Sequence, residues 1–125
     1  MNALQILYVE DDPDIREVVI LSLRRDPEFR VHAAASGREA LSLIDQGLIP
    51  DLILTDVMMP DMDGPATLAA IRTRPHLADT PVIFLTARAL DGELDRLLAL
   101  GARAVIIKPF APLTLAGQIR RILAR

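Results

Sequence analysis

The stretch LQILYVEDDPD, residues 4–14, decides the fold of this chain. Residues 4–9 form a short apolar run that stops at three consecutive acidic residues, 10–12. Pro13 can then take the first position of a helix, with Asp12 as the residue that caps it. A short apolar run that leads through acidic residues into a capped helix predicts one β-α unit.

The same pattern returns along the chain at intervals of about 20 to 25 residues. Further apolar runs at residues 30–34, 52–55, 82–85 and 105–107 are each followed by a helical pattern. The first run and the last three are continuously aliphatic, which predicts strands buried on both faces, whereas the second is weaker and is predicted to be an edge strand. We therefore predict an α/β fold, a three-layer doubly wound (βα)5 sandwich with a parallel sheet, formed by one domain of residues 1–125.

Local signals mark several helix ends. Ser36 and Glu39 form a capping box, and Gly47 closes the helix that follows. We expect the third helix over about residues 65–74, and the fourth to include Leu90.

Composition excludes several classes of function. The 125 residues carry a net charge of −3 and contain only four aromatic side chains, so direct binding of nucleic acid is not expected. The chain has no cysteine, which excludes disulfides and thiolate metal sites. It also has no signal-like or membrane-spanning segment, so we expect a soluble cytoplasmic protein without membrane contact.

Polar residues gather where the predicted strands end. In doubly wound sheets, ligands bind outside the carboxyl ends of the strands. The residues at those ends are Glu10, Asp11, Asp56, Thr86 and Lys108. Neighbouring carboxylates repel unless a cation balances them, and a small set of hard oxygen ligands suits Mg²⁺. The sequence therefore predicts a magnesium site at this edge.

Each of these residues also has an ordinary interpretation. An acidic run at residues 10–12 could simply complement a helix dipole, and Asp56 could be a turn residue. Thr86 could be an ordinary strand-end threonine, and Lys108 a solvated charge. Their joint placement on one edge favours a functional site.

Four ordered motifs resemble those of receiver domains of two-component response regulators. They are ILYVEDD at residues 6–12, DVMMPDMDG at 56–64, FLTA at 84–87, and the Gly-Ala pair at 101–102 followed by KPF at 108–110. The resemblance covers the whole chain and implies the sheet order 2-1-3-4-5. It also implies a signalling domain that is phosphorylated by a histidine kinase or a histidine phosphotransfer protein and controls a downstream protein partner or output domain.

The resemblance implies a role for each residue of the acidic pocket. Asp56 would be the phosphoacceptor, and Glu10 and Asp11 would form the acidic pocket around the metal. Asp11 and Asp56 would bind Mg²⁺ together with the backbone carbonyl of Met58. The domain would catalyse its own phosphotransfer and slow autodephosphorylation, with no turnover of an external small molecule.

Thr86 and Lys108 would contact the phosphoryl group, and the bond from Lys108 to Pro109 would be cis. Phosphorylation would draw Thr86 inward and remodel the face formed by helix four, strand five and helix five. Lys108 is the single lysine beside thirteen arginines. A compact ammonium fits beside a phosphoryl group where a guanidinium would crowd the pocket.

The kinase would dock on the first helix, around Ile15, Val18 and Val19, and on the loop after strand five.

The sequence departs from the family at several positions. Val105 replaces the aromatic residue that commonly swings inward on activation, so coupling to the output face would be weaker, differently routed, or mediated by packing rather than by a rotating ring. Arg103 and Ala104 replace an acidic pair of the winged-helix transcription factor type, so that type's dimer is not assumed. Met58 and Arg88 resemble slowly dephosphorylating members, which predicts a long-lived acyl phosphate.

Other site types fit less well. A haloacid dehalogenase-type phosphatase needs a second Asp where Met58 stands, and residues 10–12 would repel the phosphate of a flavin. An EF-hand at residues 61–64 lacks the ligand at position 59 and the distal Glu. The remaining alternative is a receiver-like interaction module that binds partners without phosphorylation.

Overall fold

A computed structural model of the chain describes residues 3–87, 92–108 and 111–124. In chain order its elements are β1 (Leu4–Val9), α1 (Pro13–Leu23), β2 (Phe29–Ala34), α2 (Gly37–Asp45), β3 (Leu52–Asp56), α3 (Gly64–Arg72), the 3₁₀ turn η1 (Pro75–Leu77), β4 (Val82–Thr86), α4 (Glu93–Ala99), β5 (Ala104–Ile107) and α5 (Leu115–Leu123). Within these ranges, no helix has both the length and the apolar character that a membrane span requires.

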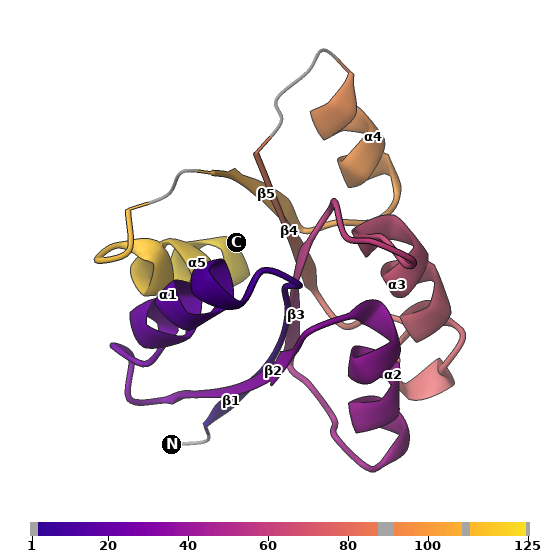
Figure 1. Ribbon diagram of the computed structural model, residues 1–125, viewed down its shortest axis with the longest axis horizontal. Coiled ribbons are helices and arrows are strands. Elements are labelled where there is room, and N and C mark those ends of the chain that lie inside the picture. Colours follow the sequence, from indigo (N-terminus) through magenta and orange to yellow (C-terminus); the bar gives the residue numbers. More distant parts are fainter. Residues whose placement is uncertain (1–2, 88–91, 109–110, 125) are drawn as a thin grey trace.

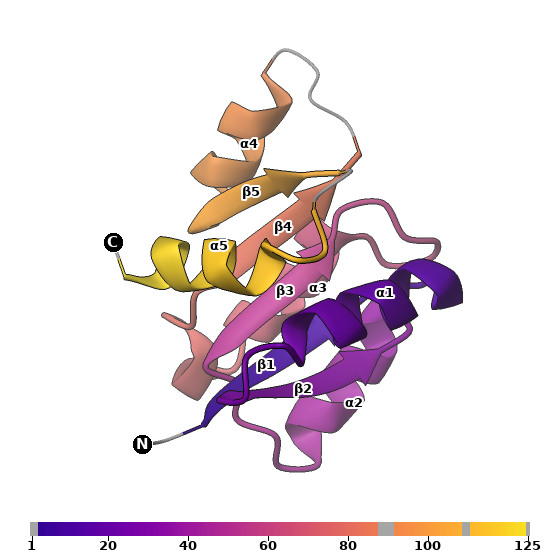
Figure 2. The same ribbon diagram turned by 90° about the vertical axis from the view of Figure 1, so that its left-hand side faces the viewer.

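The five strands form one parallel sheet in the order β2-β1-β3-β4-β5, which confirms the predicted fold and strand order. Helices α1 and α5 cover one face of the sheet, and α2, α3 and α4 cover the other (Figures 1 and 2). Asp56 lies opposite Leu85 in the pairing of β3 with β4, and Thr86 lies opposite Ile107 in the pairing of β4 with β5. The polar residues that follow these strands are therefore brought to one edge of the sheet.

The core consists of two apolar layers, one on each side of the sheet. Ile6 and Tyr8 of β1 face the layer under α1 and α5, whereas Leu7 and Val9 face the layer under the other three helices. All four side chains are fully buried. Because successive side chains of a strand point to opposite faces, a continuous apolar run supplies both layers at once. Each fully buried side chain of this size contributes about 1.5–3 kcal/mol to folding.

The predicted caps at Asp12 and Ser36 are confirmed. Asp12 caps α1, because its Oδ1 accepts hydrogen bonds from the backbone nitrogens of Asp14 and Ile15 at 2.9 and 3.1 Å. Ser36 Oγ likewise accepts a 3.1 Å bond from the backbone nitrogen of Glu39 at the start of α2. A cap of this kind is worth about 1 kcal/mol.

The prediction that the fifth strand is buried on both faces is wrong. β5 lies at an edge of the sheet, and its four residues alternate in burial, with Ile107 41% exposed. The cause is incomplete cover, because α4 spans only seven residues and Leu97 is its one buried residue. The expected inclusion of Leu90 in this helix falls outside the described residues. Helix α3 ends at Arg72, two residues earlier than predicted.

The corner between β3 and α3 is closed by Gly64. Its backbone nitrogen donates a 2.8 Å hydrogen bond to the carbonyl of Val57. A Cβ atom at this position would lie 2.3 Å from the carbonyl oxygen of Asp56 and 3.0 Å from the Cα of Val57. The chain can therefore fold back against the end of β3 only because residue 64 has no side chain.

Gly64→Ala is expected to lower the free energy of unfolding by about 1–3 kcal/mol, because the added methyl group meets backbone atoms that have little room to move. Urea denaturation measures this change. Gly117→Ala is the matched control, since Gly117 lies in α5 and a Cβ atom added there would have no neighbour within 4 Å. The control should gain about 0.5–1 kcal/mol from helix propensity. Equal stability of Gly64→Ala and the wild type would contradict the steric argument.

Candidate functional site

Three carboxylates meet where the neighbouring strands β1 and β3 end. One carboxylate oxygen from each of Glu10, Asp11 and Asp56 lies within 4.8 Å of the other two. Glu10 and Asp56 are buried, and Asp11 is partly exposed. The structure thus brings together the acidic residues that the sequence analysis placed at the strand ends.

Lys108 adds a positive charge to this cluster. Its Nζ lies 3.0 Å from Oε1 of Glu10 and 3.3 Å from Oδ1 of Asp56. The side chain of Lys108 is only 14% exposed, so the ammonium is shielded from bulk water. Its backbone nitrogen donates a 2.7 Å bond to the carbonyl of Thr86, which fixes the residue against the end of β4. The ammonium is therefore shared between two buried carboxylates.

Glu10 is the most deeply buried acid of the cluster, at 1% exposed. Burial and the nearby charge of Asp56 raise its pKa to about 7, although the hydrogen bond and the charge of Lys108 oppose that shift. The Nη1 of Arg16 donates a 2.8 Å bond to the backbone carbonyl of Glu10, and the backbone nitrogen of Asp12 donates a 3.3 Å bond to its Oε2. Because the pKa of Glu10 is raised in spite of these contacts, the single ammonium of Lys108 does not compensate fully for burying this carboxylate.

Asp56 ends β3 and is 8% exposed. The backbone nitrogen of Val57 donates a 2.9 Å bond to Oδ1, the same oxygen that faces Lys108. The backbone nitrogen of Val57 and the ammonium of Lys108 together fix the orientation of this carboxylate.

Thr86 and Met58 lie at the positions that the sequence analysis gave them. Thr86 is the last residue of β4 and is 2% exposed, directly beyond Leu85, which pairs with Asp56. Met58 follows β3 by two residues, and its side chain is 60% exposed. Two expectations, the side chain of Arg88 and the cis bond to Pro109, fall outside the described residues.

The donor set fits a small divalent cation. Three carboxylate oxygens from Glu10, Asp11 and Asp56 converge, and hard oxygen ligands in small number are those that Mg²⁺ prefers. The pKa of Glu10 is raised first by burial and then by the charge of Asp56, and a cation bound beside these carboxylates would offset the cost of holding them ionised.

Two residues near the site were missed by the sequence analysis. Arg16 reaches back from α1 to the carbonyl of Glu10, and no local motif marks a contact six residues apart. Tyr8 is fully buried, and its hydroxyl has no hydrogen-bond partner among the described residues. Burial, followed by the charges of Glu10 and Asp56, raises the pKa of Tyr8 well above its usual range. The alternation of β1 could have identified Tyr8, since it shares a face with Glu10 two residues later.

Comparison with known proteins gives one family. The family profile described as "Response regulator receiver domain" matches residues 6–120 of this chain.

Three individual proteins illustrate the match. Response regulator Rre1 of Synechocystis is 36% identical over 122 residues, which is 98% of this chain and 52% of that protein. The transcriptional regulatory protein CpxR of Escherichia coli K12 is 43% identical over 123 residues, 97% of this chain and 50% of that protein. The solved structure of the chemotaxis response regulator CheY4 of Vibrio cholerae is 34% identical with a TM-score of 0.85, covering 97% of this chain and 99% of that one. This chain spans about half the length of the first two relatives.

The raised pKa of Glu10 makes stability depend on pH. Between its ordinary value of 4.5 and about 7, the folded protein holds a proton that the unfolded chain has released. The free energy of unfolding should therefore fall as the pH rises through this window, by roughly 1–3 kcal/mol. Urea denaturation at several pH values in a chelating buffer measures the slope.

Glu10→Gln should remove most of this slope, whereas Glu17→Gln, which changes an exposed acid of α1, should leave it unchanged. A slope of wild-type size in Glu10→Gln would show that another group is responsible.

Proposed function

This chain belongs to the response regulator receiver domain family, and from that premise we propose that its 125 residues act as one receiver unit that accepts a phosphoryl group on Asp56. The observation that carries this proposal is the ammonium of Lys108 placed 3.3 Å from Asp56 within a cluster of carboxylates. The donor would be a histidine kinase or a histidine phosphotransfer protein.

The transfer is a nucleophilic displacement at phosphorus. Oδ1 of Asp56 is held by the backbone nitrogen of Val57 and by Lys108, so we assign the attack to Oδ2. The new bond joins Oδ2 to phosphorus, and the bond from phosphorus to the donor breaks with its electron pair leaving on the donor. Lys108 can turn from the carboxylates to an oxygen of the incoming group and balance part of its charge.

Glu10, Asp11 and Asp56 would hold Mg²⁺, together with the backbone carbonyl of Met58. When bound, the ion supplies positive charge that offsets the negative charge of the phosphoryl oxygens. The support is the convergence of three carboxylate oxygens within 4.8 Å.

Thr86 would report the phosphorylation to the rest of the domain. Its hydroxyl can donate to a phosphoryl oxygen, and the residue ends β4 directly beside β5. A shift of Thr86 would therefore be passed to the face formed by α4, β5 and α5, which we propose as the face that controls a partner or an output domain. Val105 of β5 would transmit the shift through packing, since no aromatic ring stands there.

The kinase would dock where α1 meets the segment after β5. Val18 and Leu21 of α1 are 47% and 57% exposed, and Leu113 is 73% exposed. All three line one groove of about 260 Å³. The hydroxyl of Ser22 donates a hydrogen bond to the carbonyl of Pro112 and joins the two segments.

Ile15, at 36% exposed, agrees with the expectation for this surface. Val19 does not, because its side chain is fully buried in the core beneath α1.

Incubation with a small phosphodonor and Mg²⁺, followed by intact-mass measurement, tests the phosphoacceptor role. The wild type should gain one phosphoryl group, and Asp56→Asn should gain none because an amide is not a nucleophile toward phosphorus. The time course of loss also checks the expectation, based on Met58 and Arg88, that the acyl phosphate lasts longer than seconds. If the wild type gains no phosphate, the alternative of a binding module that works without phosphorylation is favoured. If the Asn variant gains as much phosphate as the wild type, Asp56 is not the phosphoacceptor.

Lys108→Arg should leave the fold intact and phosphorylation measurable. It should uncouple phosphorylation from the output face, because a planar guanidinium cannot replace a point charge in the enclosed site. Backbone amide NMR signals of β5 report the coupling, and they should shift on phosphorylation of the wild type only. Shifts of wild-type size in the phosphorylated Arg variant would refute this role for Lys108.

A further inference from the structure

The side chain of Tyr8 ends in a buried hydroxyl that the proposed phosphotransfer does not use. The residue is fully buried, and its hydroxyl has no hydrogen-bond partner within the described part of the chain. Burying a hydroxyl without a partner destabilises a folded protein, whereas a phenylalanine of nearly the same shape carries no such cost. The apolar layer under α1 and α5 would accept either ring. Packing alone therefore does not account for a tyrosine at this position.

The hydroxyl of Tyr8 lies beside the carboxylate of Glu10. The two residues are two positions apart along the end of β1, so their side chains share one face of the sheet. After burial, the nearby charge of Glu10 and then that of Asp56 raise the pKa of Tyr8 well above its usual range. The hydroxyl therefore keeps its proton, and toward a carboxylate it can act only as a donor. In the resting structure it stands next to Glu10 without the geometry of a hydrogen bond.

Lys108 is the donor that Glu10 uses in this structure. Its Nζ lies 3.0 Å from Oε1 of Glu10, whereas Oε2 accepts a longer bond of 3.3 Å from the backbone nitrogen of Asp12. Arg16, whose charge also reaches the Tyr8 hydroxyl, donates to the backbone carbonyl of Glu10. When Lys108 turns to a phosphoryl oxygen, as the proposed function requires, Oε1 loses this donor while Glu10 is still buried. A replacement donor would then have to come from close by.

We propose that Tyr8 is a positioning residue whose hydroxyl donates a hydrogen bond to Glu10 when the ammonium of Lys108 leaves that carboxylate. The unpaired hydroxyl destabilises the resting state, and the new bond stabilises the state in which Lys108 has moved. Both effects favour the movement of Lys108. The inference rests on the proposed function, because phosphorylation is what would draw Lys108 away.

A double-mutant cycle tests this exchange without phosphate or metal. Lys108→Met removes the ammonium and so imitates its departure, and Tyr8→Phe removes the hydroxyl alone. Urea denaturation in a chelating buffer gives the unfolding equilibrium constant of the wild type, both single variants and the double variant. With Lys108 present, Tyr8→Phe should leave this constant unchanged or lower it. In the Lys108→Met background it should raise the constant at least about fivefold, because the hydroxyl then serves Glu10.

Ser22→Ala is the matched control for the cycle. Ser22 is buried on α1, and its hydroxyl already donates to the carbonyl of Pro112. Loss of this hydroxyl should raise the unfolding equilibrium constant by the same factor in both backgrounds. An effect of Tyr8→Phe that is likewise equal in the two backgrounds, or larger with Lys108 present, would overturn the proposal.

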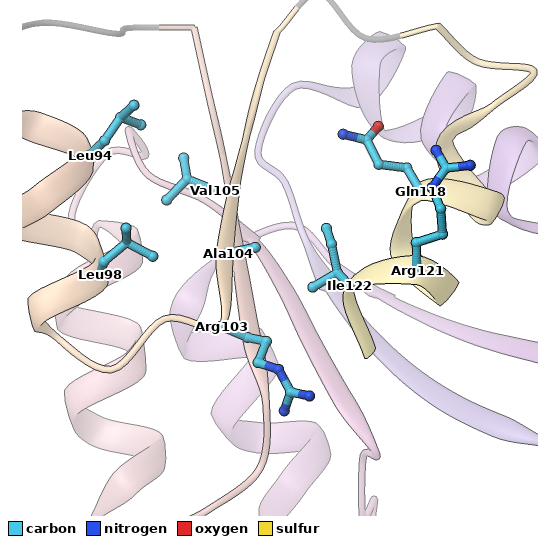
Figure 3. Close-up of a pocket in the computed structure, with 8 residues that line it drawn as sticks. All are labelled: Leu94, Leu98, Arg103, Ala104, Val105, Gln118, Arg121 and Ile122. Carbon is cyan, nitrogen blue, oxygen red and sulfur yellow. The ribbon is translucent and has the colours of Figure 1, made fainter. Parts of the chain in front are cut away.

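Tyr8→Phe should leave the rest of the domain unaltered. Leu98 of α4 and Val105 of β5 line a groove between α4 and α5 (Figure 3), and Tyr8 is not among the described residues that line it. Amide NMR signals of Leu98 and Val105 should therefore be the same in the resting variant and the resting wild type. Displaced signals would assign the measured effects to a rearranged fold and overturn the role of the hydroxyl.

A second measurement needs no substitution of Lys108, so it does not depend on the folding of that variant. Beryllofluoride with Mg²⁺ imitates a phosphoryl group on a carboxylate, and calorimetry gives its dissociation constant. Tyr8→Phe should raise this constant about threefold to tenfold. Equal constants in the variant and the wild type would overturn the proposal. If the wild type does not bind beryllofluoride, the proposed function fails instead, and the cycle still decides the role of Tyr8.

Discussion

The ammonium of Lys108 balances a cluster of carboxylates that the order of the strands forces into one place. β1 is the neighbour of β3, the central strand of the sheet, so Glu10 and Asp56 must meet where these two strands end. Lys108 follows β5, two strands away from β3, and its side chain has to extend over the end of β4 to reach them. The long stem of lysine makes this reach possible, and its compact charge fits between two buried acids.

Burial, together with the charge of Asp56, makes the ionised form of Glu10 unfavourable in the folded protein. Glu10 has a raised pKa although Lys108 is in contact with it. A cation bound beside these carboxylates would offset part of the cost of burying them. The cost of holding these carboxylates ionised side by side would thus favour binding of a divalent ion, and together with that ion a phosphoryl group.

Much of this could be predicted from local sequence, and the remainder depends on packing over distance. The apolar run of β1 and the cap at Asp12 are local signals, and the rule for strand ends identifies Glu10 and Asp56 from the order of residues alone. The contact of Arg16 with the carbonyl of Glu10 could not be predicted, because it depends on how α1 leaves the sheet. The exposure of Ile107 was likewise missed, since a four-residue aliphatic run has the same sequence in a central strand and in an edge strand.

Helix α4 buries little of its surface against the rest of the domain. It has seven residues, one of them fully buried, and it begins at Gly92, which offers no side chain for a cap. A helix this short is marginal without tertiary support, so its local unfolding should cost much less than global unfolding and its amide hydrogens should exchange early. A molecule bound against Leu94 and Leu98 would add the missing support. Order in α4 and burial of these two leucines would then favour each other, so the helix would link any contact at this surface to its own local folding.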